Sequence, residues 1–151
     1  MSTNATITVV NRATGKASTI YNHWDGYPEG VGKTLKEHYN SQELADALVA
    51  LGNVSNLDES IEQPAGHTFN TPVKGYSVFY GRDRGEDDQE AMVQDVDTFV
   101  LDRHSYGQQQ YNYMFVDGEW IRATKIPSIH EQTLAKIMND ENFKFGDYYM
   151  E

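Results

Sequence analysis

The chain has no cysteine among its 151 residues, and this absence excludes several kinds of site. Disulfide scaffolds, thiolate metal sites and cysteine nucleophiles all require a residue that is not there. No apolar run approaches the roughly 20 residues that a membrane-spanning helix needs. The first residues also lack the basic start and apolar core of a secretory signal. We therefore expect a cytoplasmic protein that makes no membrane contact.

Basic residues are scarce. Lys and Arg number 12 against 23 Asp and Glu, which gives a formal net charge of −11. Binding to nucleic acid through its phosphates requires a basic surface, so we expect no direct nucleic-acid binding. An acidic surface favours solubility, a basic protein partner, or mimicry of a polyanion.

Aromatic residues are abundant by comparison. The chain has 10 Tyr, 6 Phe and 2 Trp, although hydrophobic residues make up only 38% of it. Each buried aromatic ring removes a large area from water, so this set can supply a core. The length suits one domain of ordinary size, and we predict a single domain over residues 1–151.

Hydrophobic periodicity and turn residues predict the secondary structure. Strand-like patterns occupy residues 6–10, 17–21, 73–80, 111–116 and 119–124. Helical spacing occupies residues 31–39, 41–51 and 128–139, whereas residues 53–72 look irregular and 91–101 favour a helix only slightly. We predict an α+β fold with a largely antiparallel sheet of about five strands and about three helices packed on one face.

The segment His23-Trp24-Asp25-Gly26-Tyr27-Pro28 has the densest mixture of functional groups. If the strand from Ala17 continues to Asp25, His23 and Asp25 point to the same face and Trp24 points to the other. A histidine beside a carboxylate can act as an acid–base pair or supply two metal ligands. The alternative is structural: Trp24 and Tyr27 anchor the core, Asp25 caps a helix, and the turn leads into that helix.

The segment that follows, Gly30-Val31-Gly32-Lys33-Thr34, ends like a phosphate-binding loop. The full pattern needs an earlier glycine at the position that Tyr27 occupies. We therefore interpret Lys33 and Thr34 as ordinary residues of a first helical turn.

Two arginines follow the strand predicted at 73–80. Arg82 and Arg84 could hold a phosphate or carboxylate in a bidentate grip. The alternative is internal pairing, because acidic residues surround both arginines. A small-ligand site would combine these two arginines with His23, Trp24, Asp25 and Tyr27, provided that the two segments are adjacent.

An acidic stretch without Lys or Arg begins at Glu86. Its members are candidates for binding a partner protein: Glu86, Asp87, Asp88, Glu90, Asp95 and Asp97. Their spacing does not fit a calcium-binding loop. A solvated acidic face is the alternative. The remaining histidines have no metal-ligand spacing, and we predict no metal, no cofactor and no catalytic residue.

Several of these sequence motifs together resemble those of a widespread group of uncharacterised bacteriophage and prophage proteins. The likeness is carried by residues 20–28, Gly30-Val31-Gly32, residues 81–86 and the hairpin at 111–120, and it runs over most of residues 6–122. The resemblance implies a phage origin, expression in the cytoplasm of an infected bacterium, and an accessory role.

Two hypotheses follow from these residues. The leading one is a phage accessory protein that acts by binding, as a counter-defence or host-takeover inhibitor. It would dock a host bacterial protein with a basic surface through its acidic and aromatic residues. The alternative is a site for a small nucleotide-type ligand, in a sponge or an enzyme, built from the His23–Pro28 segment and the Arg82/Arg84 loop.

Overall fold

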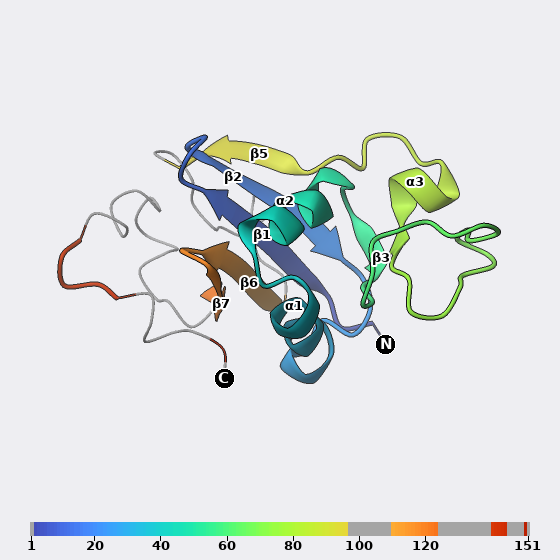
Figure 1. Ribbon diagram of the computed structural model, residues 1–151, viewed down its shortest axis with the longest axis horizontal. Coiled ribbons are helices and arrows are strands. Elements are labelled where there is room, and N and C mark those ends of the chain that lie inside the picture. The colour runs from blue at the N-terminus through green and yellow to red at the C-terminus, as the bar shows by residue number, and fades with distance from the viewer. Residues whose placement is uncertain (1, 97–109, 124–139, 145–149, 151) are drawn as a thin grey trace.

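A computed structural model describes residues 2–96, 110–123, 140–144 and 150, which form an α+β fold. Its sheet has the strand order β4-β3-β2-β1-β6-β7, and β5 also pairs with β2 (Figure 1). The strands are β1 (Ala5–Asn11), β2 (Lys16–Asn22), β3 (Val54–Asn56), β4 (Val78–Phe79), β5 (Met92–Asp95), β6 (Tyr111–Val116) and β7 (Glu119–Arg122). The helices are the π-helix η1 (Pro28–Gly32), α1 (Lys33–His38), α2 (Gln42–Ala50) and α3 (Tyr80–Arg84).

The sheet is mixed rather than largely antiparallel. The two predicted hairpins, β1–β2 and β6–β7, are antiparallel as expected. However, β1 pairs with β6 in parallel, and β2 pairs with β3 in parallel at Asn22 and Val54. Parallel neighbours need a long crossover between them, and local sequence patterns do not reveal such pairings.

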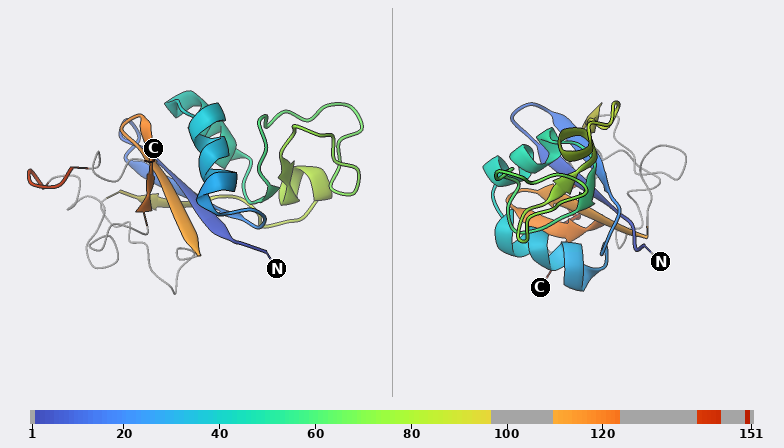
Figure 2. Two further views of the ribbon diagram at one scale, coloured as in Figure 1. Left: turned by 90° about the horizontal axis from the view of Figure 1, so that it is seen from below. Right: turned by 90° about the vertical axis from the view of Figure 1, so that its right-hand side faces the viewer.

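One face of the sheet packs against α1 and α2, and the main core lies between these layers (Figure 2). Ile7 of β1, Leu35 of α1 and Leu48 of α2 are all fully buried there. The side chain of Ser41 accepts a hydrogen bond from the N–H of Leu44, so Ser41 caps α2. The third helix, α3, packs beside β4 instead of joining this layer.

The opposite face of β1 is buried as well, but it carries threonines. Thr6 Oγ1 donates to Asn112 Oδ1 at 2.6 Å, and the hydroxyls of Thr8 and Thr19 lie 2.9 Å apart. Buried hydroxyls are tolerated when they are hydrogen-bonded in this way. Strand β1 therefore lies at the centre of the fold and is buried on both faces.

The connection between α2 and β6 differs most from the prediction. The residues expected to be irregular contain β3, and the strand expected at 73–80 is confined to Val78–Phe79 and followed by α3. The slight preference for a helix over 91–101 was wrong for β5, and residues 97–101 lie outside the described part. The helix predicted at 128–139 also lies outside it. No helix of the described residues is long and apolar enough to cross a membrane.

Candidate functional site

The segment from His23 to Pro28 forms a turn at the end of β2, not an extension of the strand. Strand β2 ends at Asn22, and Asp25 has a left-handed backbone with a φ of 56°. The prediction that His23 and Asp25 share a strand face is therefore wrong. His23 Nδ1 lies 2.8 Å from the hydroxyl of Tyr21, whereas Asp25 Oδ1 accepts a hydrogen bond from the hydroxyl of Tyr27 at 3.3 Å.

Close backbone contacts explain two glycines of this turn. The N–H of Gly26 donates to the carbonyl of Thr3 at 2.8 Å, and its own carbonyl accepts from the hydroxyl of Tyr113 at 2.6 Å. A Cβ atom on Gly26 would lie 2.8 Å from the Thr3 oxygen, and one on Gly30 would lie 2.4 Å from the Asp25 oxygen. Only glycine fits at these positions, so the turn has one defined backbone course.

This fixed turn presents two aromatic side chains to solvent. Trp24 is 45% exposed and Tyr27 is 38% exposed, so the idea that both anchor the core is wrong. The turn does lead into a helix, because Pro28 is the first residue of η1. Asp25 supports it through its backbone carbonyl, which accepts from the N–H of Val31 at 2.9 Å. The charge of Asp25 also raises the pKa of Tyr27.

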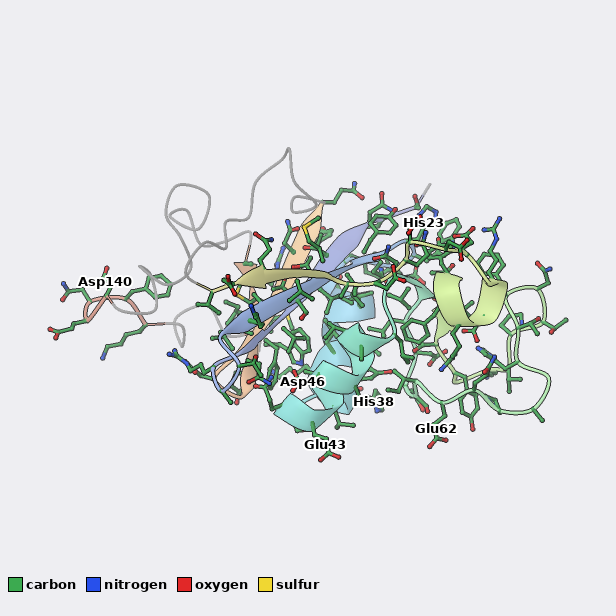
Figure 3. All side chains as sticks on the ribbon, turned by 90° about the horizontal axis from the view of Figure 1, so that it is seen from above. His23, His38, Glu43, Asp46, Glu62 and Asp140 are labelled. Atoms are coloured by element: carbon green, nitrogen blue, oxygen red, sulfur yellow. The ribbon has the colours of Figure 1, made fainter. Side chains whose placement is uncertain are left out.

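The ring of Trp24 is positioned by its neighbours. Its backbone N–H donates to the carbonyl of Ser55 at 3.0 Å. The His23 ring meets the Trp24 ring edge to face, with the ring centroids 4.8 Å apart. In Figure 3, His23 lies on the side of the molecule away from Glu43 and Asp46 of α2. His23 and the exposed acidic side of α2 thus lie on different sides of the molecule.

A groove of about 400 Å³ lies beside Trp24. Strands β3 and β4 and the loop of residues 69–76 form its walls. The side chains that line the groove include Trp24, Ser55, Asn56, Asp58, Phe69, Lys74 and Tyr76. This groove was not predicted from the sequence, because its residues lie far apart in the chain.

Arg82 binds within the protein instead of facing a ligand. Its Nε and Nη2 atoms lie 3.0 and 3.1 Å from the two carboxylate oxygens of Asp83. The same guanidinium donates to the carbonyls of Ile61 and of Ser77. The alternative of internal pairing is therefore the one that the structure shows, and Arg82 is not free to grip an anion.

Arg84 is also paired internally. Its Nε lies 3.2 Å from Glu86 Oε1, and its guanidinium sits over the Phe69 ring at 4.6 Å from the centroid. The side chain of Arg84 is half exposed, so both contacts are weak ones at the surface. The predicted clamp of two arginines does not form.

Comparisons with protein-family models, curated proteins and solved structures find no match to this chain. Function is therefore inferred from the side chains that the turn and the groove present.

His67, one of the histidines for which the sequence predicted no ligand role, is buried behind the groove and has a structural role. His67 is 2% exposed, its Nδ1 accepts from the N–H of Val73 at 2.9 Å, and its Nε2 lies 3.0 Å from the carbonyl of Ser77. These partners fix the neutral ring with its proton on Nε2. The carboxylate of Asp83 lies 3.6 Å from Nε2. Because backbone groups occupy both ring nitrogens, His67 holds the loop together and does not face a substrate.

The acidic stretch is divided between paired and unpaired residues. Glu86 is paired with Arg84, Asp95 is paired with Lys16, and Asp97 lies outside the described residues. Exposed acids without an ion pair to any described residue are Asp87, Asp88 and Glu90. Within this stretch, the exposed acids without an ion pair therefore lie in the loop between α3 and β5. Among the described residues, no group of three or more His, Asp or Glu side chains is placed to hold a metal ion.

Proposed function

We propose that this protein acts by binding, as a phage accessory protein that docks a host protein in counter-defence or host takeover. The observation that supports the binding role is the exposure of Trp24 and Tyr27 on a turn of fixed backbone. Rigid, exposed aromatic side chains give large contact areas at low entropic cost, and they dominate the energetics of many interfaces. The phage setting is supported by the resemblance of the sequence.

The acidic loop supports a basic partner surface. Asp87, Asp88 and Glu90 carry unpaired charge, and the whole chain has a net charge of −11. Such a field accelerates encounter with a positively charged partner, and the effect falls as salt rises.

The backbone links the acidic loop to the aromatic turn. The N–H of Asn53 donates to the carbonyl of Gln89 in the acidic loop, and the carbonyl of Ser55 accepts from the N–H of Trp24. Two residues of extended chain separate these points, which corresponds to about 7 Å. An interface of standard size covers roughly 800 Å² on each partner, so one partner can contact both the loop and the turn.

The test begins with affinity capture from the bacterial host and identification of the partner by mass spectrometry. Binding of the purified partner is then compared between wild type, Trp24→Ala and the double variant Asp87→Lys/Asp88→Lys. We expect faster dissociation for Trp24→Ala and slower association for the charge reversal. Leu44→Ala is the control, because Leu44 is 42% exposed and belongs to α2, which contributes no residue to the acidic loop or to the turn of His23 to Pro28. Unchanged kinetics in both test variants would refute the proposed surface.

A small-ligand function is the second candidate. In its original form it required Arg82 and Arg84 as an anion clamp, and both side chains have internal partners. What favours a small ligand is the groove beside Trp24. Unlike the two arginines, three polar side chains of this groove make no side-chain hydrogen bond or ion pair with any described residue: Lys74, Asn56 and Tyr76.

A further inference from the structure

The groove beside Trp24 has the size and the lining of a small-molecule site. Its volume of about 400 Å³ falls within the range of roughly 300–1,000 Å³ that such sites occupy. Trp24, Phe69 and Tyr76 supply aromatic surface from two separate parts of the chain. Aromatic walls with a few polar groups are typical of sites that bind planar rings.

Three polar side chains of this groove have no hydrogen-bond or ion-pair partner among the described residues. Lys74, Asn56 and the hydroxyl of Tyr76 make no side-chain hydrogen bond or ion pair with any described residue. An unpaired ammonium beside aromatic rings is therefore available for an anionic group of a ligand.

The loop that carries Lys74 and Tyr76 is held in place from behind. Arg82 donates to the carbonyls of Ile61 and Ser77, and the N–H of Val73 donates to Nδ1 of the buried His67. A groove whose walls are fixed before binding loses little conformational entropy when a ligand enters. The buried cluster thus has a positioning role for the groove.

We propose that the groove binds a small planar aromatic ligand with one anionic group, of the nucleoside monophosphate type. The base stacks against Trp24 and Tyr76, and Lys74 takes the phosphate. Asn56 offers an amide donor and acceptor to the edge of the base, and Asp58 offers a carboxylate acceptor. This site goes beyond protein docking and does not depend on it.

The charge of the protein narrows the ligand class further. A net charge of −11 repels anions, and Lys74 is the lysine that lines the groove. One ammonium compensates part of the charge of one phosphate group, whereas each added phosphate brings further negative charge into the negative field of the protein. The groove is therefore expected to prefer monophosphates to triphosphates.

Tryptophan fluorescence reports on this site directly. Trp24 is 45% exposed whereas Trp120 is 2% exposed, so a stacked base quenches the emission of Trp24 selectively. The full chain is titrated with AMP, GMP, CMP and UMP, with the matching triphosphates and nucleosides, and with inorganic phosphate. We expect saturable quenching by at least one monophosphate and weaker binding of its triphosphate and of phosphate alone.

Matched variants assign the contacts. Lys74→Ala is expected to weaken monophosphate binding by about tenfold or more and to leave nucleoside binding unchanged. Lys33→Ala is the control, because Lys33 is an exposed lysine of α1 that does not line the groove. Trp24→Ala removes the reporter, so its affinity is measured by calorimetry and is expected to fall. Tyr76→Ala is expected to weaken nucleoside and monophosphate alike.

Two results would overturn the proposal. One is the absence of heat and of quenching for all four monophosphates up to roughly 1 mM, where binding free energy would be only about −4 kcal/mol. The other is equal affinity of Lys74→Ala and wild type for a monophosphate that binds. Neither result bears on the docking surface, because Lys74→Ala leaves Asp87, Asp88 and Tyr27 intact and partner capture is measured separately.

Discussion

Replacing Gly30 by alanine tests whether close packing fixes the aromatic turn. The new Cβ would lie 2.4 Å from the backbone oxygen of Asp25 and 3.1 Å from its Cβ. That oxygen accepts the N–H of Val31 at 2.9 Å, so it cannot retreat without weakening this bond. Gly30 lies in η1, and its φ is outside the left-handed region, so alanine would be strained by the contact and not by its own dihedral angles.

The expected loss of stability combines two terms. Weakening the Asp25–Val31 hydrogen bond costs about 1 kcal/mol. Forcing a methyl group into a closely packed site costs a further 1–3 kcal/mol, approximately. The free energy of unfolding should therefore fall by about 2–4 kcal/mol, which for a chain of this size lowers Tm by roughly 5–15 °C.

Urea unfolding followed by far-UV circular dichroism measures this change. The midpoint should shift with an unchanged m value if only stability is altered. Gly15→Ala is the matched control: its φ is +71° and no atom lies within 4 Å of the new Cβ, so it carries only backbone strain of about 1–2 kcal/mol. A Gly30→Ala protein as stable as wild type, or more stable than Gly15→Ala, would refute the steric explanation.

Substitutions at three further positions test other parts of the structure. Asp25→Gly should retain or increase the free energy of unfolding in urea. Asp25→Val should lower it by about 1–2 kcal/mol, because a φ of 56° is costly for a β-branched residue. Equal stability of the two variants would contradict this explanation. Asp83→Ala should lower the free energy of unfolding by about 3–5 kcal/mol, because it leaves the largely buried Arg82 without its carboxylate. A thermal melt like that of wild type would show that the Arg82–Asp83 pair does not stabilise the fold. Burial raises the pKa of Tyr39 to about 12, above its value of 10.0 in the unfolded chain. Its contribution to stability is therefore complete below pH 10 and is lost as pH rises toward about 12, by up to roughly 3 kcal/mol. Tyr39→Phe should reduce this loss in alkaline urea titrations, and an unchanged profile would show that other groups cause it.

The hairpins were predictable because their determinants are local. Alternating β-branched residues and the Gly15 turn define β1 and β2, and Asp117-Gly118 defines the turn between β6 and β7. The parallel pairing of β1 with β6 joins residues about a hundred positions apart, such as Ala5 and Tyr111. No local pattern encodes that pairing, so the sheet was assigned too much antiparallel character.

The short elements were missed because tertiary contacts form them. Strand β3 has three residues, and its carbonyls at Val54 and Ser55 accept hydrogen bonds from His23 and Trp24 of the turn. Helix α3 has five residues, and the carboxylate of Asp83 accepts the N–H of Phe79 at its start. Elements of this length are not stable alone, so propensity has little influence on them.

The site was predicted in part. The structural alternative correctly made Gly26-Tyr27-Pro28 a turn into a helix, but the strand was extended too far, to Asp25. Residue types alone do not predict the exposure of Trp24 or the left-handed backbone of Asp25. The groove partner residues Lys74 and Tyr76 lie about fifty positions further along the chain, and only the folded structure brings them beside Trp24. Residue types indicated the turn, and three-dimensional packing determined what faces solvent.

The two kinds of residue in this turn should therefore respond oppositely to mutation. Gly26 and Gly30 are fixed by backbone contacts, so alanine at either position should destabilise the fold. Trp24 is 45% exposed and its ring packs edge to face with the His23 ring, so Trp24→Ala should cost at most about 1 kcal/mol in urea unfolding. If Trp24 serves binding, this variant should lose ligand or partner affinity while it keeps its stability. A loss of several kcal/mol would instead mean that Trp24 is needed for folding, and the proposed binding role would lose its principal support.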